Sequence, residues 1–179
     1  MRASILIVFC FLQAAKPAPV PGLPTPAGVY IRQDDAKWIK LDQPVTAKSK
    51  TKGMGLFIET DGLSGLGMTT VYYGAEASLE ISATRPILYV RGAGSPKEAV
   101  IVQLTRKKDS RLLQTSKSDA TVENKGGFRK ADIRRVTVSV YSDDSFSVTP
   151  ENELKPGEYL LLFGNSGGAF EFGITAAKR

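Results

Sequence analysis

The chain has 179 residues, a formal net charge of +6, no histidine and a single cysteine, Cys10. Zinc, haem and copper sites draw mainly on histidine and cysteine, so this composition argues against those metal centres, and we expect no cofactor. The length is sufficient for one domain with a hydrophobic core of its own.

The first fifteen residues have the features of a secretory signal peptide. Arg2 precedes an apolar run over residues 5–12, and the small residues Ala14 and Ala15 follow it. The run is shorter than the roughly 20 apolar residues of a membrane span, although an uncleaved anchor is the alternative. We therefore expect cleavage near Ala15, no transmembrane span afterwards, and a location in the periplasm, on the cell surface or outside the cell.

Residues 16–28 form a distinct proline-rich segment. Five of these thirteen residues are proline, which predicts a stiff polyproline-type spacer without a core. The remaining residues, 29–179, are expected to form a single domain.

From residue 29 onward, short apolar segments alternate with turn residues. GVYIRQ and WIKLDQ, which flank Asp34 and Asp35, predict an opening hairpin. GLFIET, SLEIS and PILYV predict further strands, whereas the glycine-rich stretch DGLSGLGMTTVYYGAE has no assignment. EAVIVQLTR and RLLQTS predict another hairpin, with its turn at residues 107–110.

The last third of the chain shows the clearest strand periodicity. In RRVTVSVY, Val136, Val138 and Val140 face one way and the intervening polar residues face the other, as in a strand buried on one face. SFSVTP and AFEFGIT alternate similarly, and GEYLLLFG is typical of a strand covered on both sides. No segment has a helical period over ten or more residues. We predict an all-β antiparallel sandwich, loosely Ig-like, with a small β-barrel as the alternative.

Residues 164–168, GNSGG, have the G-x-S-x-G spacing of a nucleophile elbow. The serine hydrolases that use such spacings activate the serine with a histidine, which this chain lacks. An elbow also requires a strand–turn–helix arrangement, whereas strand-like segments flank this motif on both sides. We interpret the motif as a hairpin loop and Ser166 as non-catalytic.

Two other motifs are also weak evidence for a catalytic or metal site. Ser49 and Lys52 have the spacing of a serine–lysine dyad, but they lie in a basic stretch without helical periodicity, where a solvated lysine stays protonated. The pairs Asp34–Asp35 and Asp143–Asp144 offer oxygen ligands for calcium, yet no segment matches a calcium-binding loop. Aspartates in turns commonly bond the local backbone, and we expect no metal.

A pair of carboxylates could hydrolyse polysaccharide without histidine. Glu158 and Glu171 would lie on neighbouring strands if residue 166 is at the tip of a hairpin. Trp38 and the pair Tyr72–Tyr73 could line a sugar platform, although packing of Trp38 onto the core is the alternative. Four glutamates are candidates: Glu59, Glu80, Glu158 and Glu171.

Basic residues are concentrated in the middle of the chain. Residues 97–135 hold eleven Lys or Arg against five Asp or Glu. In an exported protein, such a segment could contact an acidic polysaccharide or anionic lipid head groups; nucleic acid is less favoured, because Phe128 is the only aromatic residue nearby for stacking. A solvated face, or protection of strand edges, is the structural alternative. The predicted contact residues are at one hairpin tip: Arg106, Lys107, Lys108 and Arg111.

In this order, the segments GVYIRQDDAKWIKL, PILYVRG, VQLTRKKDSRLLQ and LKPGEYLLLFG resemble a family of uncharacterised exported bacterial proteins. The resemblance covers most of the mature chain and implies an exported all-β protein with a closing P-G-E-Y strand and no assigned reaction. The sequence thus predicts a non-enzymatic binding, accessory or structural module of the cell envelope. Its partner would be an anionic envelope component or another envelope protein. The alternative is a histidine-free carboxylate hydrolase acting on polysaccharide.

Overall fold

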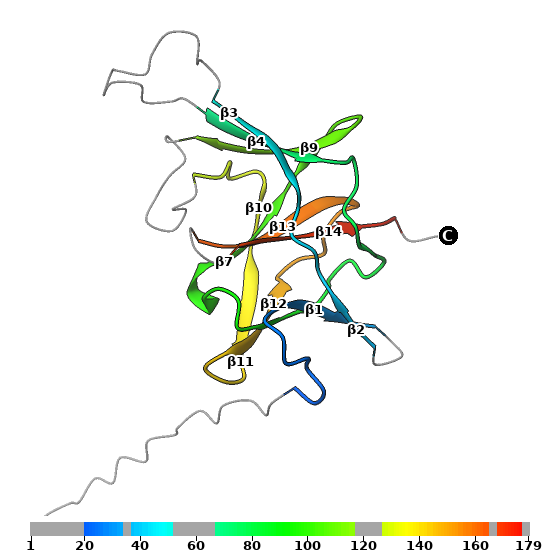
Figure 1. Cartoon of the computed structure of the whole chain (residues 1–179), viewed down its shortest axis with the longest axis vertical. Coiled ribbons are helices and arrows are strands. Elements are labelled where there is room, and N and C mark those ends of the chain that lie inside the picture. Colours follow the sequence, from blue (N-terminus) through cyan, green and yellow to red (C-terminus); the bar gives the residue numbers. More distant parts are fainter. Residues whose placement is uncertain (1–19, 34–36, 52–66, 117–126, 165–167, 177–179) are drawn as a thin grey trace, which may run out of the picture.

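The computed structural model describes residues 20–33, 37–51, 67–116, 127–164 and 168–176, and this part of the chain is dominated by β-strands (Figure 1). Its one helical element is a single turn of 3-10 helix, η1 (Pro96–Glu98). The predicted all-β class is confirmed.

The strands of the described residues form three sheets. Sheet A has the order β11 (Val136–Val140), β12 (Ser145–Pro150), β6 (Leu88–Arg91), β1 (Gly28–Arg32) and β2 (Trp38–Lys40). Sheet C has the order β10 (Ile133–Arg134), β7 (Ala99–Gln103), β13 (Gly157–Phe163), β14 (Ala169–Ile174) and β5 (Glu80–Ile81). Sheet B has the order β3 (Thr46–Thr51), β4 (Gly67–Tyr73), β9 (Ser110–Ser116) and β8 (Thr105–Arg106). Within the described ranges, the strand pairs are antiparallel except β14–β5, which is parallel.

Sheet C is the middle layer, because both of its faces are covered. Alternate residues of β13 point to opposite sides: Tyr159 and Leu161 join a core shared with sheet A, whereas Leu160 joins a core shared with sheet B. Figure 1 shows β13 and β14 between the two outer sheets. The sheets do not close on themselves, so the sandwich is confirmed and the barrel alternative is wrong.

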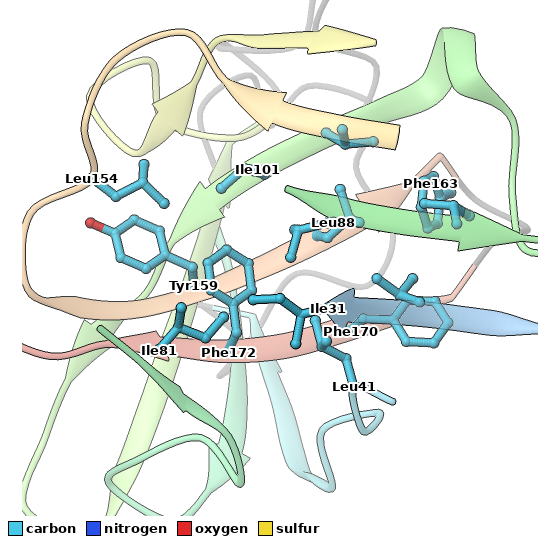
Figure 2. Close-up of a cluster of buried hydrophobic side chains, with 14 of the residues drawn as sticks. Ile31, Leu41, Ile81, Leu88, Ile101, Leu154, Tyr159, Phe163, Phe170 and Phe172 are labelled. Atoms are coloured by element: carbon cyan, nitrogen blue, oxygen red, sulfur yellow. The ribbon is translucent and has the colours of Figure 1, made fainter. Parts of the chain in front are cut away.

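The larger core lies between sheets A and C. It is rich in aromatic side chains, and Figure 2 shows Tyr159 and Phe172 side by side in it, with ring centroids 5.6 Å apart. Phe163 packs edge-on against Phe146 and Phe170. Burial of these large apolar side chains is the main stabilising contribution to the contact between the two sheets.

Most predicted strands are present. The opening hairpin is β1–β2, the valines of β11 lie opposite the apolar residues of β12, and β13 is buried on both faces as its sequence indicates. The unassigned glycine-rich stretch contributes β4, and GLFIET lies outside the described residues. The predicted strand over residues 98–106 divides into β7 of sheet C and β8 of sheet B.

Leu104 is the residue at which the chain crosses between these two sheets. Its N–H still donates to the Glu158 carbonyl of sheet C at 2.8 Å, while its side chain is buried in the core between sheets B and C. The chain then continues into the β8–β9 hairpin of sheet B. This crossover places the hairpin against the sheet C face that carries Glu158.

Residues 20–27, the second half of the predicted proline-rich spacer, lie against sheet A. The Arg91 guanidinium donates to the Leu23 carbonyl at 3.4 Å, and the Tyr30 hydroxyl donates to the Pro26 carbonyl at 2.7 Å. Both donors belong to sheet A, so this half of the segment is held to the folded part of the chain.

Candidate binding surfaces

The tip of the β8–β9 hairpin carries three exposed basic residues, Arg106, Lys107 and Lys108. The Lys107 N–H donates to the Ser110 carbonyl at 2.8 Å, which closes the turn. Arg106 forms an exposed ion pair with Glu76, and Asp109 is also exposed at the tip. The nearby acidic residues therefore reduce the positive charge of the hairpin, and little of its field would extend beyond them.

Arg111, the fourth residue of the predicted polyanion contact, is buried and faces inward. Its side chain is only 2% exposed, and it lies opposite the buried Tyr72 in the register of β4 and β9. Side chains alternate along a strand, so its position in β9 points the guanidinium toward sheet C. The assignment of Arg111 to the polyanion contact is wrong, because a polyanion outside the molecule cannot reach this side chain.

Two glutamates of sheet C surround the Arg111 guanidinium. Its Nη2 lies 2.7 Å from the Glu171 Oε2, and its Nη1 lies 3.8 Å from the Glu158 Oε2. Both carboxylates are almost completely buried, at 3% and 8% side-chain exposure for Glu158 and Glu171. We call Arg111, Glu158 and Glu171 the buried ion cluster; it joins sheet B to sheet C.

The loop that follows β4 closes over the buried ion cluster. Arg111 donates to the carbonyls of Tyr73 and Gly74 at 3.0 and 3.1 Å. In return, the Ala77 N–H donates to Glu158 at 2.7 Å and the Ser78 N–H donates to Glu171 at 3.3 Å. Backbone groups on the loop therefore satisfy part of the hydrogen-bonding demand of the charges, as buried ions require.

These contacts exclude Glu158 and Glu171 as the predicted catalytic carboxylates. The two residues lie on neighbouring strands, as the sequence indicates, since Leu160 of β13 is opposite Glu171 and Gly173 of β14 is opposite Glu158. A glycosidase needs its two carboxylates on either side of the bond that it cleaves. Here both are buried and in contact with one guanidinium, so no sugar can enter between them. Glu80 is exposed at the edge of sheet C, and Glu59 lies outside the described residues.

The buried ion cluster has an excess of one negative charge when both glutamates are ionised. Desolvation by burial raises the pKa of Glu158 above its ordinary value, although the Ala77 N–H and the Arg111 charge oppose this effect. Nearby Glu80 raises the pKa of Glu158 further. A carboxyl group with a raised pKa in the folded protein stabilises the fold in its protonated form, and that contribution is lost as the pH rises through the raised pKa.

Glu158→Gln should therefore remove part of the pH dependence of stability. The amide oxygen can still accept the Ala77 N–H, and Glu171 remains as the partner of Arg111. We expect the parent protein to lose stability as the pH rises from about 4.5 toward neutrality, and the variant to lose less. Urea unfolding at a series of pH values measures this difference. Glu171→Gln is the matched control, and the assignment fails if Glu158→Gln is the more destabilising of the two at neutral pH.

The remaining sequence candidates do not form a catalytic or metal site among the described residues. β13 and β14 pair up to Leu162 and Ala169, so residues 164–168 connect two strands of a hairpin, as predicted; Ser166 itself lies outside the described part. Ser49 belongs to strand β3 and not to a helix. Asp144 accepts from Ser142 and pairs with Arg91 at 3.4 Å, and no cluster of potential metal ligands occurs in the described ranges.

Three half-buried aromatic residues form a row on the outer face of sheet A. Trp38 of β2 packs edge-on against Tyr89 of β6, with ring centroids 5.1 Å apart, and Tyr89 lies nearly parallel to Tyr141 at 6.5 Å. Ile39 packs against the core, so the adjacent Trp38 lies on the opposite face. Packing of Trp38 into the core, one of the two alternatives from the sequence, is therefore wrong. We call Trp38, Tyr89 and Tyr141 the aromatic row.

Polar groups accompany the aromatic row. The Arg32 guanidinium lies 5.8 Å from the centre of the Trp38 ring, within the range of a cation–π contact. The Tyr141 hydroxyl is hydrogen-bonded to the Ser147 hydroxyl at 3.0 Å. Tyr73, by contrast, is 58% exposed on sheet B, so it does not extend this row.

A surface pocket of about 480 Å³ lies next to the end of β2. Lys40, Asp42 and Gln43 line one side, and the glycine-rich turn after β6, residues 92–94, lines another. Leu41 and Phe170, both labelled in Figure 2, belong to the core and also contribute to the lining. We call this the Lys40 pocket.

No protein-family model, curated protein or solved structure matches this chain. The resemblance to exported bacterial proteins therefore remains a prediction. In the part of the chain that the structure describes, no helix is long and apolar enough to span a membrane.

Proposed function

We propose that this protein is an exported, non-enzymatic module that binds a polysaccharide of the cell envelope on the outer face of sheet A. The observation that carries this proposal is the aromatic row, Trp38, Tyr89 and Tyr141. The core of the sandwich lies on the other face of the sheet, so these rings do not join the layers. Residues 20–27 reach one end of the row, where a Cβ added at Gly22 would lie 3.5 Å from the Trp38 Nε1. Aromatic residues that lie together outside a core commonly mark interaction sites.

The chemistry of the row suits a sugar. A pyranose ring has faces of C–H groups that pack on aromatic rings, and an edge of hydroxyls that need hydrogen-bonding partners. The row offers both kinds of contact, with the tyrosine hydroxyls and the Arg32 guanidinium beside the rings. The rings already pack against each other, so binding would immobilise few additional side-chain rotamers.

The hairpin tip is the second candidate surface. Arg106, Lys107 and Lys108 are exposed and could contact an anionic envelope component. The Glu76 ion pair and Asp109 offset this charge. We therefore propose the tip as an accessory contact and the aromatic row as the main one.

The single tryptophan of the chain allows a direct test. Titration with soluble fragments of envelope polysaccharide should change the Trp38 emission, and Tyr89→Ala should weaken binding about tenfold because it removes the central ring. The fragments should be recovered at their original length, since the module does not cleave them.

Two control variants separate the surfaces in this titration. Tyr73→Ala removes an exposed tyrosine of sheet B and should leave the affinity unchanged. A double variant, Lys107→Ala with Lys108→Ala, tests the tip. If the double variant abolishes binding while Tyr89→Ala does not, the main site is the hairpin and the proposal is wrong. Shortened fragments would contradict the non-enzymatic assignment.

A further inference from the structure

We infer that the Lys40 pocket binds one uncharged, hydroxyl-rich sugar residue of the glycan that lies on the aromatic row, an inference that rests on the proposed function. Its volume of about 480 Å³ lies within the roughly 300–1,000 Å³ typical of small-ligand sites. The pocket combines an apolar contribution from Leu41 and Phe170 with polar groups along one side. Such a combination is common in ligand sites.

Gly28 allows Lys40 to reach this pocket. A Cβ atom added at Gly28 would lie 2.6 Å from the Lys40 Cε and 3.3 Å from its Nζ. The aliphatic part of Lys40 therefore crosses β1 at the one position without a side chain, and its ammonium group lies beside the Gly28 backbone. Both residues line the pocket.

Asp42 and Gln43 provide the complementary polar groups. The Asp42 carbonyl accepts the Glu171 N–H at 3.0 Å, which holds this segment on β14. The side chains of Asp42 and Gln43 are exposed and line the pocket with Lys40. One ammonium, one carboxylate and one amide together supply both hydrogen-bond donors and acceptors.

This set of charges favours a neutral ligand. A carboxylate ligand would be attracted by Lys40 but repelled by Asp42. A cationic ligand would be attracted by Asp42 but repelled by Lys40. A sugar hydroxyl can donate to Asp42 and accept from Lys40, so it satisfies both groups. The pocket thus differs from the hairpin tip, for which an anionic ligand would be expected.

The pocket and the aromatic row are both reached from strand β2, since Lys40 lines the pocket and Trp38 belongs to the row. Trp38 and Lys40 lie two residues apart on the same face of β2, a separation of about 7 Å along a strand. A glycan that packs on Trp38 can therefore place its neighbouring residue in the Lys40 pocket. Specificity for the kind of sugar would come from the pocket, and the aromatic rings would supply the contact area.

The experiment uses a glycan array in which each neutral oligosaccharide of hexoses or N-acetylhexosamines has a counterpart carrying hexuronic acids. We expect the mature protein to bind neutral members at least tenfold more tightly than their acidic counterparts. Lys40→Met and Asp42→Asn should each weaken binding of the neutral oligosaccharides about tenfold in calorimetric titrations. Lys97→Met and Glu151→Gln, which change exposed charges elsewhere, are the matched controls and should have no effect.

The possible failures are distinguishable. If acidic oligosaccharides bind more tightly, or if the two pocket variants bind neutral glycans as well as the parent does, the inference is overturned while the aromatic row can still be the binding face. If no glycan is bound and none changes the Trp38 emission, the proposed function is wrong, and the inference falls with it.

Discussion

Replacing Arg111 with methionine should lower the free energy of unfolding by about 3–5 kcal/mol. Methionine fills a similar volume but leaves Glu158 and Glu171 buried without their shared cation. It also removes the donors to the Tyr73 and Gly74 carbonyls, so the loop over the buried ion cluster loses two of its attachments. Urea unfolding followed by circular dichroism measures the effect.

Arg106→Met is the matched control for this prediction. Arg106 lies opposite Arg111 in the β8–β9 hairpin, but it is exposed, and exposed ion pairs contribute about 1 kcal/mol or less. A second test combines Arg111→Met with Glu158→Gln and Glu171→Gln. This triple variant should recover part of the lost stability, because no unpaired charge remains in the interior. If Arg111→Met is no more destabilising than Arg106→Met, the buried ion cluster does not hold sheets B and C together.

The strands with regular alternation could be predicted from the sequence, and the packing of the sheets could not. In β14, Phe170, Phe172 and Ile174 all join the core, as their period of two indicates. In β11, Val136 and Val138 pack against the core, whereas Val140 at the end of the strand is 39% exposed. The continuous apolar run of β13 correctly indicates burial on both faces. Nothing local, however, indicates that the chain changes sheets at Leu104, since the residues on both sides of it have the same strand-like character.

The error at Arg111 has a specific physical cause. Four basic residues within six positions are typical of an exposed hairpin, and arginine is rarely buried without a partner. The partners here are Glu158 and Glu171, which are distant in the sequence and come together only when sheet B packs on sheet C. The sequence does contain one usable signal: Glu171 lies between two phenylalanines of the buried strand β14, and Glu158 directly precedes the apolar run of the buried strand β13.

The aromatic row illustrates the same limitation. The sequence around Trp38 does not show whether this side chain points to the core or to solvent, because the three residues of β2 are too few for a clear alternation of apolar and polar residues. Tyr89 and Tyr141 come from distant segments and reach Trp38 only through the order of strands in sheet A. A binding face assembled across strands in this way depends on the topology and has no local motif.

Gly94→Ala should be among the most destabilising single-methyl changes in the chain, with a loss of about 2–5 kcal/mol. Gly94 has a φ of +68°, which is unfavourable for alanine, and an added Cβ would lie only 2.4 Å from the Phe163 Cβ. Phe163 is completely buried against Phe146 and Phe170, so it cannot move aside without disturbing the core.

Gly92→Ala separates the backbone contribution, which comes from the positive φ, from the steric overlap with Phe163. Gly92 also has a positive φ, +56°, but its added Cβ would meet only Ala27 at 3.2 Å, so the expected loss is about 1–2 kcal/mol. The difference between the two variants measures the overlap with Phe163, and Phe163→Leu in the Gly94→Ala background should recover part of it, because the smaller side chain makes room for the methyl group. Equal losses for Gly92→Ala and Gly94→Ala would show that Phe163 yields without cost. In that case the side of the Lys40 pocket formed by Gly94 can accept a larger residue, because Phe163 behind it can move.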